Sequence, residues 1–477
     1  GRRVVVLERQ VRAGGNAVSE RIGGFLMEHG PSSLSASPEE SLLWSRELGL
    51  EPRRLELGPG VRRRYLVGGG GLYGIPTHPF GFLTSGYLSV GARLRMMAEI
   101  AVPRGRPGSE ETVAAFCRRR FGAEFVERVV DPLVAGMFAG TAATLSMPAT
   151  FPRLLEMELR DGSITRAVLR SRLRRQRSRE KMPGRRLFSW RDGVGALPGA
   201  LAARLGPAVK TGIAVRRIAP FAGGFRVEAG AAGRFAASAV VVATQPHVAA
   251  ALLESIDATA AEAAAAIDAP PLAVVFLGYR REQVAHALDG LGYLTPRREG
   301  RALSGALFCS TMFAGRAPEG HVALAGYLGG CRAPGLAGLP AGELVRLARA
   351  EFHDLLGVRG DPVVARVRQW PRGLPQYRVG HGRVVAALRG VEQSHPGLFV
   401  TGNYFTGPGV AACLAEAKEA AARADGHLRR LAREAGTATL PAKSAWARPR
   451  QAGAGDPLLP AGHTARRASP SRTAGRR

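Results

Sequence analysis

Near the start of the chain, a short run of β-branched residues ends in an acid that could hold a ribose. Residues 4–7 (VVVL) are expected to form a strand, and Glu8 follows directly. In a dinucleotide-binding βαβ unit, the carboxylate at the end of the second strand accepts hydrogen bonds from ribose hydroxyls. Many structural strands also end in Glu, so this feature alone does not separate a binding site from an ordinary strand.

A glycine-containing turn and a polar segment follow that strand. Gly14 and Gly15 form the turn, and residues 28–33 read EHGPSS. Glycine lets the backbone approach a ligand closely because it has no Cβ. Together with Glu8, these residues indicate a site for a bulky planar or phosphate-bearing ligand.

A second candidate segment, TGNYFTGPGV, occupies residues 401–410 between an expected strand and a helix of about 20 residues. A helix N-terminus presents N–H groups without partners and the positive end of the helix dipole. Such an end can stabilise negative charge on a reduced flavin ring. An ordinary loop before a helix explains the same residues.

Helical patterns interrupt a sheet region that later resumes, so we expect discontinuous domains. The expected strands lie near residues 25–28, 61–76 (a pair), 186–190, 212–215, 224–228, 239–243, 272–279, 321–327 and 398–402. The expected helices lie near residues 38–48, 89–101, 110–119, 122–135, 150–175, 342–356 and 410–433.

Composition limits the class of protein to which the chain can belong. The chain has 477 residues and is 45% hydrophobic, which suits a globular protein of roughly two to four domains. Its four cysteines show no CxxC spacing, so we expect no disulfide framework, no metal site and a reducing compartment. No apolar run approaches the length of a transmembrane helix.

Positive charge is concentrated in two stretches. Lys and Arg number 67 against 38 acidic residues, a net charge of +29, and residues 160–186 and 436–477 are the richest in arginine. A solvated surface explains the first stretch. Attraction to an anionic membrane is the alternative, because Ile164, Val168 and Leu169 lie among the arginines. Nucleic acid is disfavoured because no aromatic residues interleave. The second stretch should be a disordered tail.

The motifs occur in the order of one enzyme family. From residue 1 to about 433, the chain resembles the protoporphyrinogen/coproporphyrinogen oxidase branch of the flavin amine oxidase superfamily. The segments that carry the resemblance are VVVLERQVRAGG, GFLMEHGPSSL, PRGRPGSEETVAAFCRRRFG, LVAGMFAGTAATLSM, FSWRDGVGALPGAL, VVVATQP, WPRGLPQYRVGH and LFVTGNYFTGPGVAACL. The FAG…LS and LPQY..GH elements distinguish this branch from monoamine and polyamine oxidases.

The resemblance implies a set of FAD contacts. They are Glu8, Arg9, Asn16, Gly30, Pro31, Ser32, Ser33, Val215, Trp370, Pro408, Gly409 and Val410. It also implies that Gly140 faces the reacting carbon of the substrate. Trp370 alone would be assigned to core packing, and its place just before LPQY favours the flavin. No catalytic side chain is assigned, since the flavin carries the redox chemistry.

The chain departs from the family pattern in three places. The GxGxxG loop is absent, and since the chain opens at Gly1 in the middle of a fold, we expect about 25 to 30 upstream residues to supply it. Pro408 has no N–H, so a hydrogen bond to flavin must come from Gly409 or Val410. Phe80 stands where some relatives carry an arginine for a substrate propionate. No cysteine lies near Trp370, so no thioether to flavin is expected there.

We therefore expect an α/β fold with an FAD-binding dinucleotide-type domain, a mixed-sheet substrate domain and a helical insertion. The expected ranges are 1–60, 186–245 and 366–435 for the FAD domain, 61–76 and 246–365 for the substrate domain, 77–185 for the substrate- or membrane-facing insertion, and 436–477 for the tail.

The implied reaction is oxidation of a porphyrinogen, protoporphyrinogen IX or coproporphyrinogen III, to a porphyrin in haem biosynthesis, with FAD as cofactor and O₂ as acceptor. The alternatives are another amine-oxidase-type flavoenzyme and a basic, non-catalytic relic that no longer binds flavin. We expect a cytoplasmic protein, with peripheral attachment to the inner face of the cell membrane as a further prediction. The oligomeric state stays open.

Overall fold

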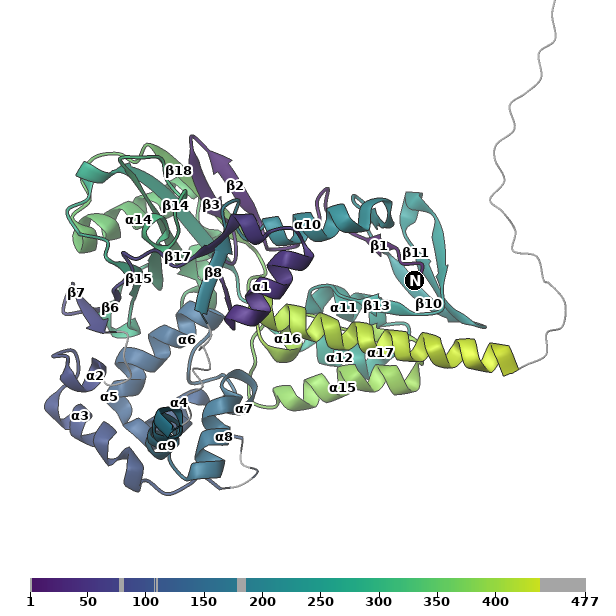
Figure 1. The fold of residues 1–477 in the computed structure, drawn as a ribbon, viewed down its shortest axis with the longest axis horizontal. Helices are drawn as coiled ribbons and strands as arrows, with labels where there is room; N and C mark the ends of the chain where they lie inside the picture. Colours follow the sequence, from purple (N-terminus) through teal and green to yellow (C-terminus); the bar gives the residue numbers. More distant parts are fainter. Residues whose placement is uncertain (1, 77–80, 107, 109, 178–185, 438–477) are drawn as a thin grey trace, which may run out of the picture. The chain divides into compact units, whose positions relative to one another are not determined.

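The computed structural model describes residues 2–76, 81–106, 108, 110–177 and 186–437 (Figure 1). By its contacts the chain divides into two units, and the first unit runs from Gly1 to Arg430. All elements discussed below lie in this first unit, and only the last helix continues into the second. The expected disordered tail and Phe80 lie outside the described residues.

The largest sheet is mixed and has seven strands. Its order is β18-β14-β17-β16-β15-β6-β7, and every neighbouring pair is antiparallel except β15 and β6. The strands are β6 (Arg63–Gly68), β7 (Gly71–Pro76), β14 (Leu272–Arg280), β15 (Gly290–Leu294), β16 (Gly305–Phe308), β17 (His321–Gly329) and β18 (Val364–Trp370).

The two faces of this sheet are covered by different elements. Along β14, Val275 and Leu277 pack in the core cluster that includes helix α14 (Ala341–Leu356), while Val274 and Phe276 face the opposite side. That opposite side is covered by the hairpin of β2 (Ser19–Ile22) and β3 (Phe25–Glu28). Gly278 permits this contact, because a Cβ there would lie 2.6 Å from the Phe25 ring.

Short parallel pairs and their helices form a second core. Strand β1 pairs with β9, and β13 pairs with β19. The elements are β1 (Val6–Leu7), β9 (Val209–Lys210), β10 (Arg217–Phe221), β11 (Gly224–Glu228), β12 (Arg234–Ala237), β13 (Val240–Val242), β19 (Leu398–Val400), α11 (Pro246–Leu253), α12 (Ala258–Ala265) and α15 (His381–Ser394). Apolar residues of most of these elements share one cluster. Parallel strands backed by helices are the expected nucleotide-binding architecture.

A third core forms around Trp190, which is fully buried. It involves β4 (Leu34–Ala36), β5 (Arg54–Glu56) and β8 (Arg186–Trp190), in the order β4-β8-β5, with α1 (Pro38–Glu47) and α10 (Ala196–Leu205). Helix α1 starts where expected because Ser37 and Glu40 form a capping box.

The insertion consists of helices around their own core. They are α2 (Gly81–Thr84), α3 (Val90–Met97), α4 (Val113–Phe121), α5 (Ala123–Phe125), α6 (Asp131–Phe138), α7 (Met147–Thr150), α8 (Pro152–Asp161) and α9 (Ile164–Arg177). Arg120, which is fully buried there, pairs with Glu99 and Glu158. The remaining helices are α13 (Cys309–Met312), α16 (Asn403–Thr406) and α17 (Val410–Thr437).

Two expected elements are wrong in detail. Residues 212–215 form no strand. The strand in this region is β9, which ends at Lys210, and Gly212 follows it in the left-handed region with a φ of +72°. The single helix expected near 150–175 is two helices, because Gly162 ends α8 in the left-handed region with a φ of 77°.

Two packing relations cross the expected domain ranges, which stay a prediction. Strand β18 belongs to the seven-stranded sheet, although residues from 366 onward were assigned to the FAD domain. Helices α11 and α12 share the second core with β13 and β19, although residues from 246 onward were assigned to the substrate domain.

Candidate functional site

Three residues predicted as flavin contacts meet at one turn. The indole Nε1 of Trp370, at the end of β18, donates a hydrogen bond of 2.8 Å to the backbone oxygen of His29. The next residue, Gly30, lies so close to Asn16 that a Cβ at position 30 would be 2.3 Å from the backbone oxygen of Asn16. The fold therefore brings together segments that are far apart in the sequence.

The start of α17 shares a core with the neighbours of that turn. Ala17 and Val410 pack against the cluster of Leu34 and Trp190. Ala17 follows Asn16, and Leu34 follows Ser33, so both polar segments border the same core as the helix start. Pro31, Ser32 and Ser33 are half-buried.

The first turn of α17 presents backbone donors. Gly409 O accepts the hydrogen bond of Cys413 N at 3.0 Å, so the helical bonding begins there. Within the described part of the chain, no acceptor is paired with the N–H groups of Val410 and Ala411. A Cβ at Gly409 would meet nothing within 4 Å. Free donors beside open space at a helix start suit an electron-rich ligand.

Glu8 and Val215 lie in the second core. The backbone N–H of Glu8 donates to Lys210 O at 2.9 Å, which continues the β1–β9 pairing, and its Oε1 accepts from Gln10 N at 2.7 Å. Val215 packs against the same cluster as Leu7. Glu8 is half-buried and Arg9 is exposed, so these residues stand at the carboxyl end of a parallel pair, where nucleotides bind in such folds.

Glu28 begins the polar segment 28–33, but the sequence alone predicts no individual role for this carboxylate. Only 7% of it is exposed. Its carboxylate accepts hydrogen bonds from Ser19 Oγ at 2.6 Å and from Val194 N at 2.9 Å. Burial, partly offset by these bonds and by Arg316, raises the pKa of Glu28 from 4.5 to about 7. An acid in an otherwise apolar strand (FLME) was the signal that could have indicated it.

Arg316 is the buried counter-charge of Glu28. Its Nη2 lies 3.4 Å from Glu28 Oε1 and donates to Ser189 Oγ at 2.7 Å, while Nη1 donates to Trp190 O at 3.2 Å. Burial lowers the pKa of this guanidinium. Ser32 lines the same small pocket as Glu28 and Arg316, so the pair borders the turn described above. No local motif marks Arg316 in the sequence.

Gly140 lies apart from these residues. The space that a side chain at this position would occupy is already taken by protein, since a Cβ would be 2.4 Å from Gln376 Oε1. Gln376 Nε2 donates to Phe138 O at 2.8 Å, and Cys331 Sγ lies 3.4 Å from its Oε1. Gln376 of the LPQY segment therefore joins the helical insertion to the end of β17, and the fold explains why residue 140 is glycine.

The described residues contain neither a metal-binding cluster nor a membrane-spanning helix. No group of three or more His, Cys, Asp or Glu in that part of the chain could hold a metal ion. Nor does the described part contain a helix that is both long and apolar enough to cross a membrane.

Comparison with known proteins agrees with this architecture. The family of flavin containing amine oxidoreductases matches residues 1–424. Protoporphyrinogen oxidase 1 of Arabidopsis thaliana chloroplasts is 30% identical over 452 residues, which cover 90% of this chain and 84% of that protein. Coproporphyrinogen III oxidase of Bacillus subtilis is 24% identical, over 87% of this chain and 90% of that protein.

Solved structures show the same fold. A structure from Exiguobacterium sp. 255-15, provisionally named protoporphyrinogen oxidase, matches with a TM-score of 0.74 at 21% identity, covering 89% of this chain and 93% of that one. Cyclohexylamine oxidase of Brevibacterium oxydans matches with a TM-score of 0.60 at 17% identity, covering 88% and 93%.

The fold and the match define a flavin-dependent oxidoreductase. The chain belongs to the family of flavin containing amine oxidoreductases, and its cofactor is FAD. The residues present fit this group. The N–H groups at the start of α17 face no acceptor in the described chain, the space beside Gly409 is open, and Nδ1 of His29 is buried without a hydrogen-bond partner.

Proposed function

We propose that this protein oxidises a porphyrinogen, either protoporphyrinogen or coproporphyrinogen III, to the corresponding porphyrin, with FAD as cofactor and O₂ as electron acceptor. The observation that carries the proposal is the match to porphyrinogen oxidases along most of both chains. The joined turn of His29, Trp370 and Asn16 supports it, because a planar cofactor needs such a fixed backbone surface.

In this proposal the protein contributes orientation and a site with little water. Gly30, Pro31, Ser32 and Ser33 would contact the flavin along the turn, with Asn16 beside them and Trp370 holding the turn in place. Gly409 and Val410 would donate backbone N–H groups, next to Pro408. Glu8 and Arg9 would hold the ribose, and Val215 the adenine. When bound, the flavin transfers electrons from the substrate to O₂.

The substrate would lie where the insertion meets the seven-stranded sheet. Gly140 and Gln376 stand at this junction, where Gln376 occupies the space that a side chain at position 140 would take. That Gly140 faces the reacting carbon of the substrate stays a prediction. We also propose that the domain boundaries follow the packing: the FAD domain extends through α12, and the substrate domain includes β18.

The test is a substrate screen under O₂ with FAD supplied. Porphyrin fluorescence should appear from at least one of the two porphyrinogens, with matching O₂ consumption, while putrescine and cyclohexylamine should give none. Oxidation of an amine without porphyrin formation would indicate another type of amine oxidase. Failure to bind FAD at all would favour a non-catalytic protein.

A surface of the insertion also supports attachment to an anionic membrane. Val90, Leu94, Met97 and Ile100 follow one face of α3 and its extension, and they are 64%, 57%, 52% and 38% exposed. Arg166 of α9 donates to Ile100 O at 3.3 Å, so the arginine-rich helix lies beside this stripe. Each arginine near an anionic surface adds about 1 kcal/mol.

Sedimentation with vesicles tests this attachment. The full chain should bind anionic vesicles at low salt and be released at high salt, because ions screen the attraction. Leu94→Glu should weaken binding, whereas Leu43→Glu on α1, with a similar exposure of 54% against 57%, should not. Equal binding of both variants to anionic vesicles would contradict the role of the stripe.

A further inference from the structure

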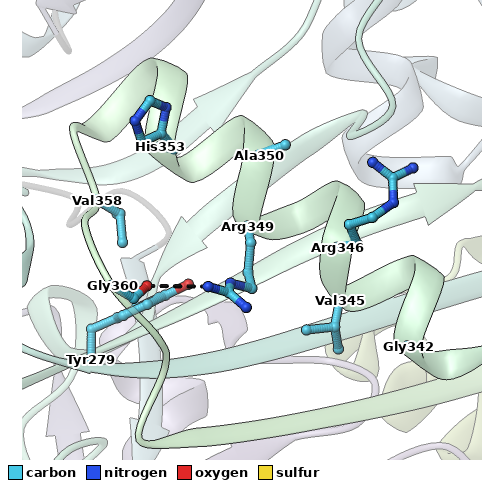
Figure 2. Close-up of a pocket in the computed structure, with 9 residues that line it drawn as sticks. All are labelled: Tyr279, Gly342, Val345, Arg346, Arg349, Ala350, His353, Val358 and Gly360. Carbon is cyan, nitrogen blue, oxygen red and sulfur yellow. Dashed lines mark hydrogen bonds between the residues drawn. The ribbon is translucent and has the colours of Figure 1, made fainter.

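A pocket of about 360 Å³ opens between one face of α14 and the loop that follows it (Figure 2). It lies on the α14 side of the seven-stranded sheet, since Tyr279 belongs to the core cluster under α14. The β2–β3 hairpin, which leads into the proposed flavin turn, packs on the opposite side. The pocket is therefore separate from the proposed flavin site.

One wall of the pocket contains a buried donor without a partner. The side chain of Tyr279 is 0% exposed, and its hydroxyl makes no hydrogen bond within the described chain. Figure 2 shows the hydroxyl directed toward Arg349. An unpaired buried hydroxyl is costly, so an acceptor that entered the pocket would relieve this cost.

The guanidinium of Arg349 lies toward that hydroxyl, and two further basic residues of α14 line the same pocket. Arg346, Arg349 and His353 are three and four residues apart on α14, so they share the face that lines the pocket (Figure 2). Arg349 pairs with Asp361, which is 83% exposed. Exposed ion pairs contribute little free energy, so an entering anion could replace this carboxylate. Val345 and Val358 add apolar wall.

We propose that this pocket binds a small organic anion, a carboxylate or a phosphate ester with a compact apolar body. The hydroxyl of Tyr279 and the guanidinium of Arg349 both donate to the anionic group, and the valines contact the apolar part. Arg346 and His353 line the entrance. This proposal does not depend on the oxidase activity.

Calorimetric titration of the full chain provides the test. The probes are benzoate and phenyl phosphate, which distinguish the two anion types, and neutral benzyl alcohol. Saturable binding of either anion, with no binding of benzyl alcohol, is the expected result. No saturable binding of either anion, or equal binding of the alcohol, would overturn the proposal.

Variants locate the site. Tyr279→Phe and Arg349→Gln should each weaken anion binding by about tenfold or more, because each removes a donor to a charged group. Tyr293→Phe is the matched control: its hydroxyl is also buried and has no hydrogen-bond partner among the described residues, but it does not line the pocket. Unchanged affinity in Tyr279→Phe and Arg349→Gln, or an equal loss in the control, would contradict the assignment.

Discussion

A carboxyl group that is buried beside the proposed flavin turn needs polar partners in place of water. Glu28 has three: the guanidinium of Arg316, the hydroxyl of Ser19 and the backbone N–H of Val194. These partners come from separate segments, so Glu28 holds the hairpin, the loop after β8 and the loop before β17 together. Because burial outweighs these contacts, the side chain retains its proton at higher pH than an exposed glutamate does.

This shift predicts a pH-dependent stability. The pKa of Glu28 is about 7 in the folded chain, whereas the pKa of an exposed glutamate, which stands for the unfolded chain, is 4.5. The folded state therefore binds more protons in this window, and stability falls as pH rises across it. Relative to Glu28→Gln, which cannot titrate, the wild type should lose about 3 kcal/mol between pH 4.5 and 7. Urea denaturation of both proteins measures the difference, and a constant difference would contradict the shift.

Gly30 is predicted to tolerate no side chain. A Cβ would lie 2.3 Å from the Asn16 oxygen, so Gly30→Ala must move the turn. We expect a loss of about 1–3 kcal/mol of stability together with reduced flavin content. Gly199→Ala in α10 is the control, because its Cβ would meet nothing within 4 Å and alanine favours a helix. Denaturation and flavin absorbance measure both effects, and equal behaviour of the two variants would argue against the tight turn.

At the scale of elements, the start of α17 is a surface that the protein itself leaves open. The packing of Val410 fixes the helix against the Trp190 core, while no described protein atom lies within 4 Å of a Cβ at Gly409. A ligand rather than packing would therefore explain a requirement for glycine at this position.

Gly409→Val tests this explanation. Without flavin, the variant should lose no more than about 1 kcal/mol of stability, because a Cβ at this position has no described protein atom within 4 Å. Flavin affinity should fall by about tenfold or more, because the side chain would occupy the cofactor's space. Gly382→Val, in the first turn of α15 and equally open, should keep its flavin. Titration of the apoprotein with FAD gives both affinities, and an unchanged value for Gly409→Val would make this segment an ordinary loop.

At the scale of the whole molecule, the helical insertion is tied to the large sheet through Asp131. Its carboxylate accepts from Arg332 Nη2 at 2.8 Å and from Ala142 N at 3.0 Å. Arg332 also donates to Thr295 O at 2.7 Å. The insertion is thereby connected to the sheet at the junction where the substrate is proposed to lie.

Breaking the ion pair of Asp131 and Arg332 should lower the stability of the fold more than breaking an exposed ion pair. Asp131→Asn leaves the nearly buried Arg332, whose side chain is 9% exposed, without its counter-charge, and we expect a loss of about 3 kcal/mol. Asp268→Asn is the control, because its pair with Arg378 is about half exposed and should contribute less than about 1 kcal/mol. Denaturation curves compare them, and equal losses would show that the junction pair is not special.

Much of the molecule could be predicted from local patterns. The β6–β7 hairpin, the capped start of α1 and the strand–turn–helix around residues 398–410 are set by residues close in sequence, and they were located nearly as expected. The strand predicted at residues 212–215 is wrong: Gly212 adopts a left-handed conformation, which an apolar pattern does not reveal.

The sequence by itself determined the family and the flavin cofactor, because these depend on contiguous motifs. The segments that we propose to contact the flavin belong to the same motifs. Only the tertiary structure decided which of them meet: Trp370 and His29 are 341 residues apart, and Arg316 and Glu28 are 288 apart. Likewise, the anion pocket exists only where α14 packs beside Tyr279. Such contacts depend on how distant elements pack. Burial in the packed structure then shifts the pKa of groups such as Glu28, whose neighbours in the sequence give no sign of it.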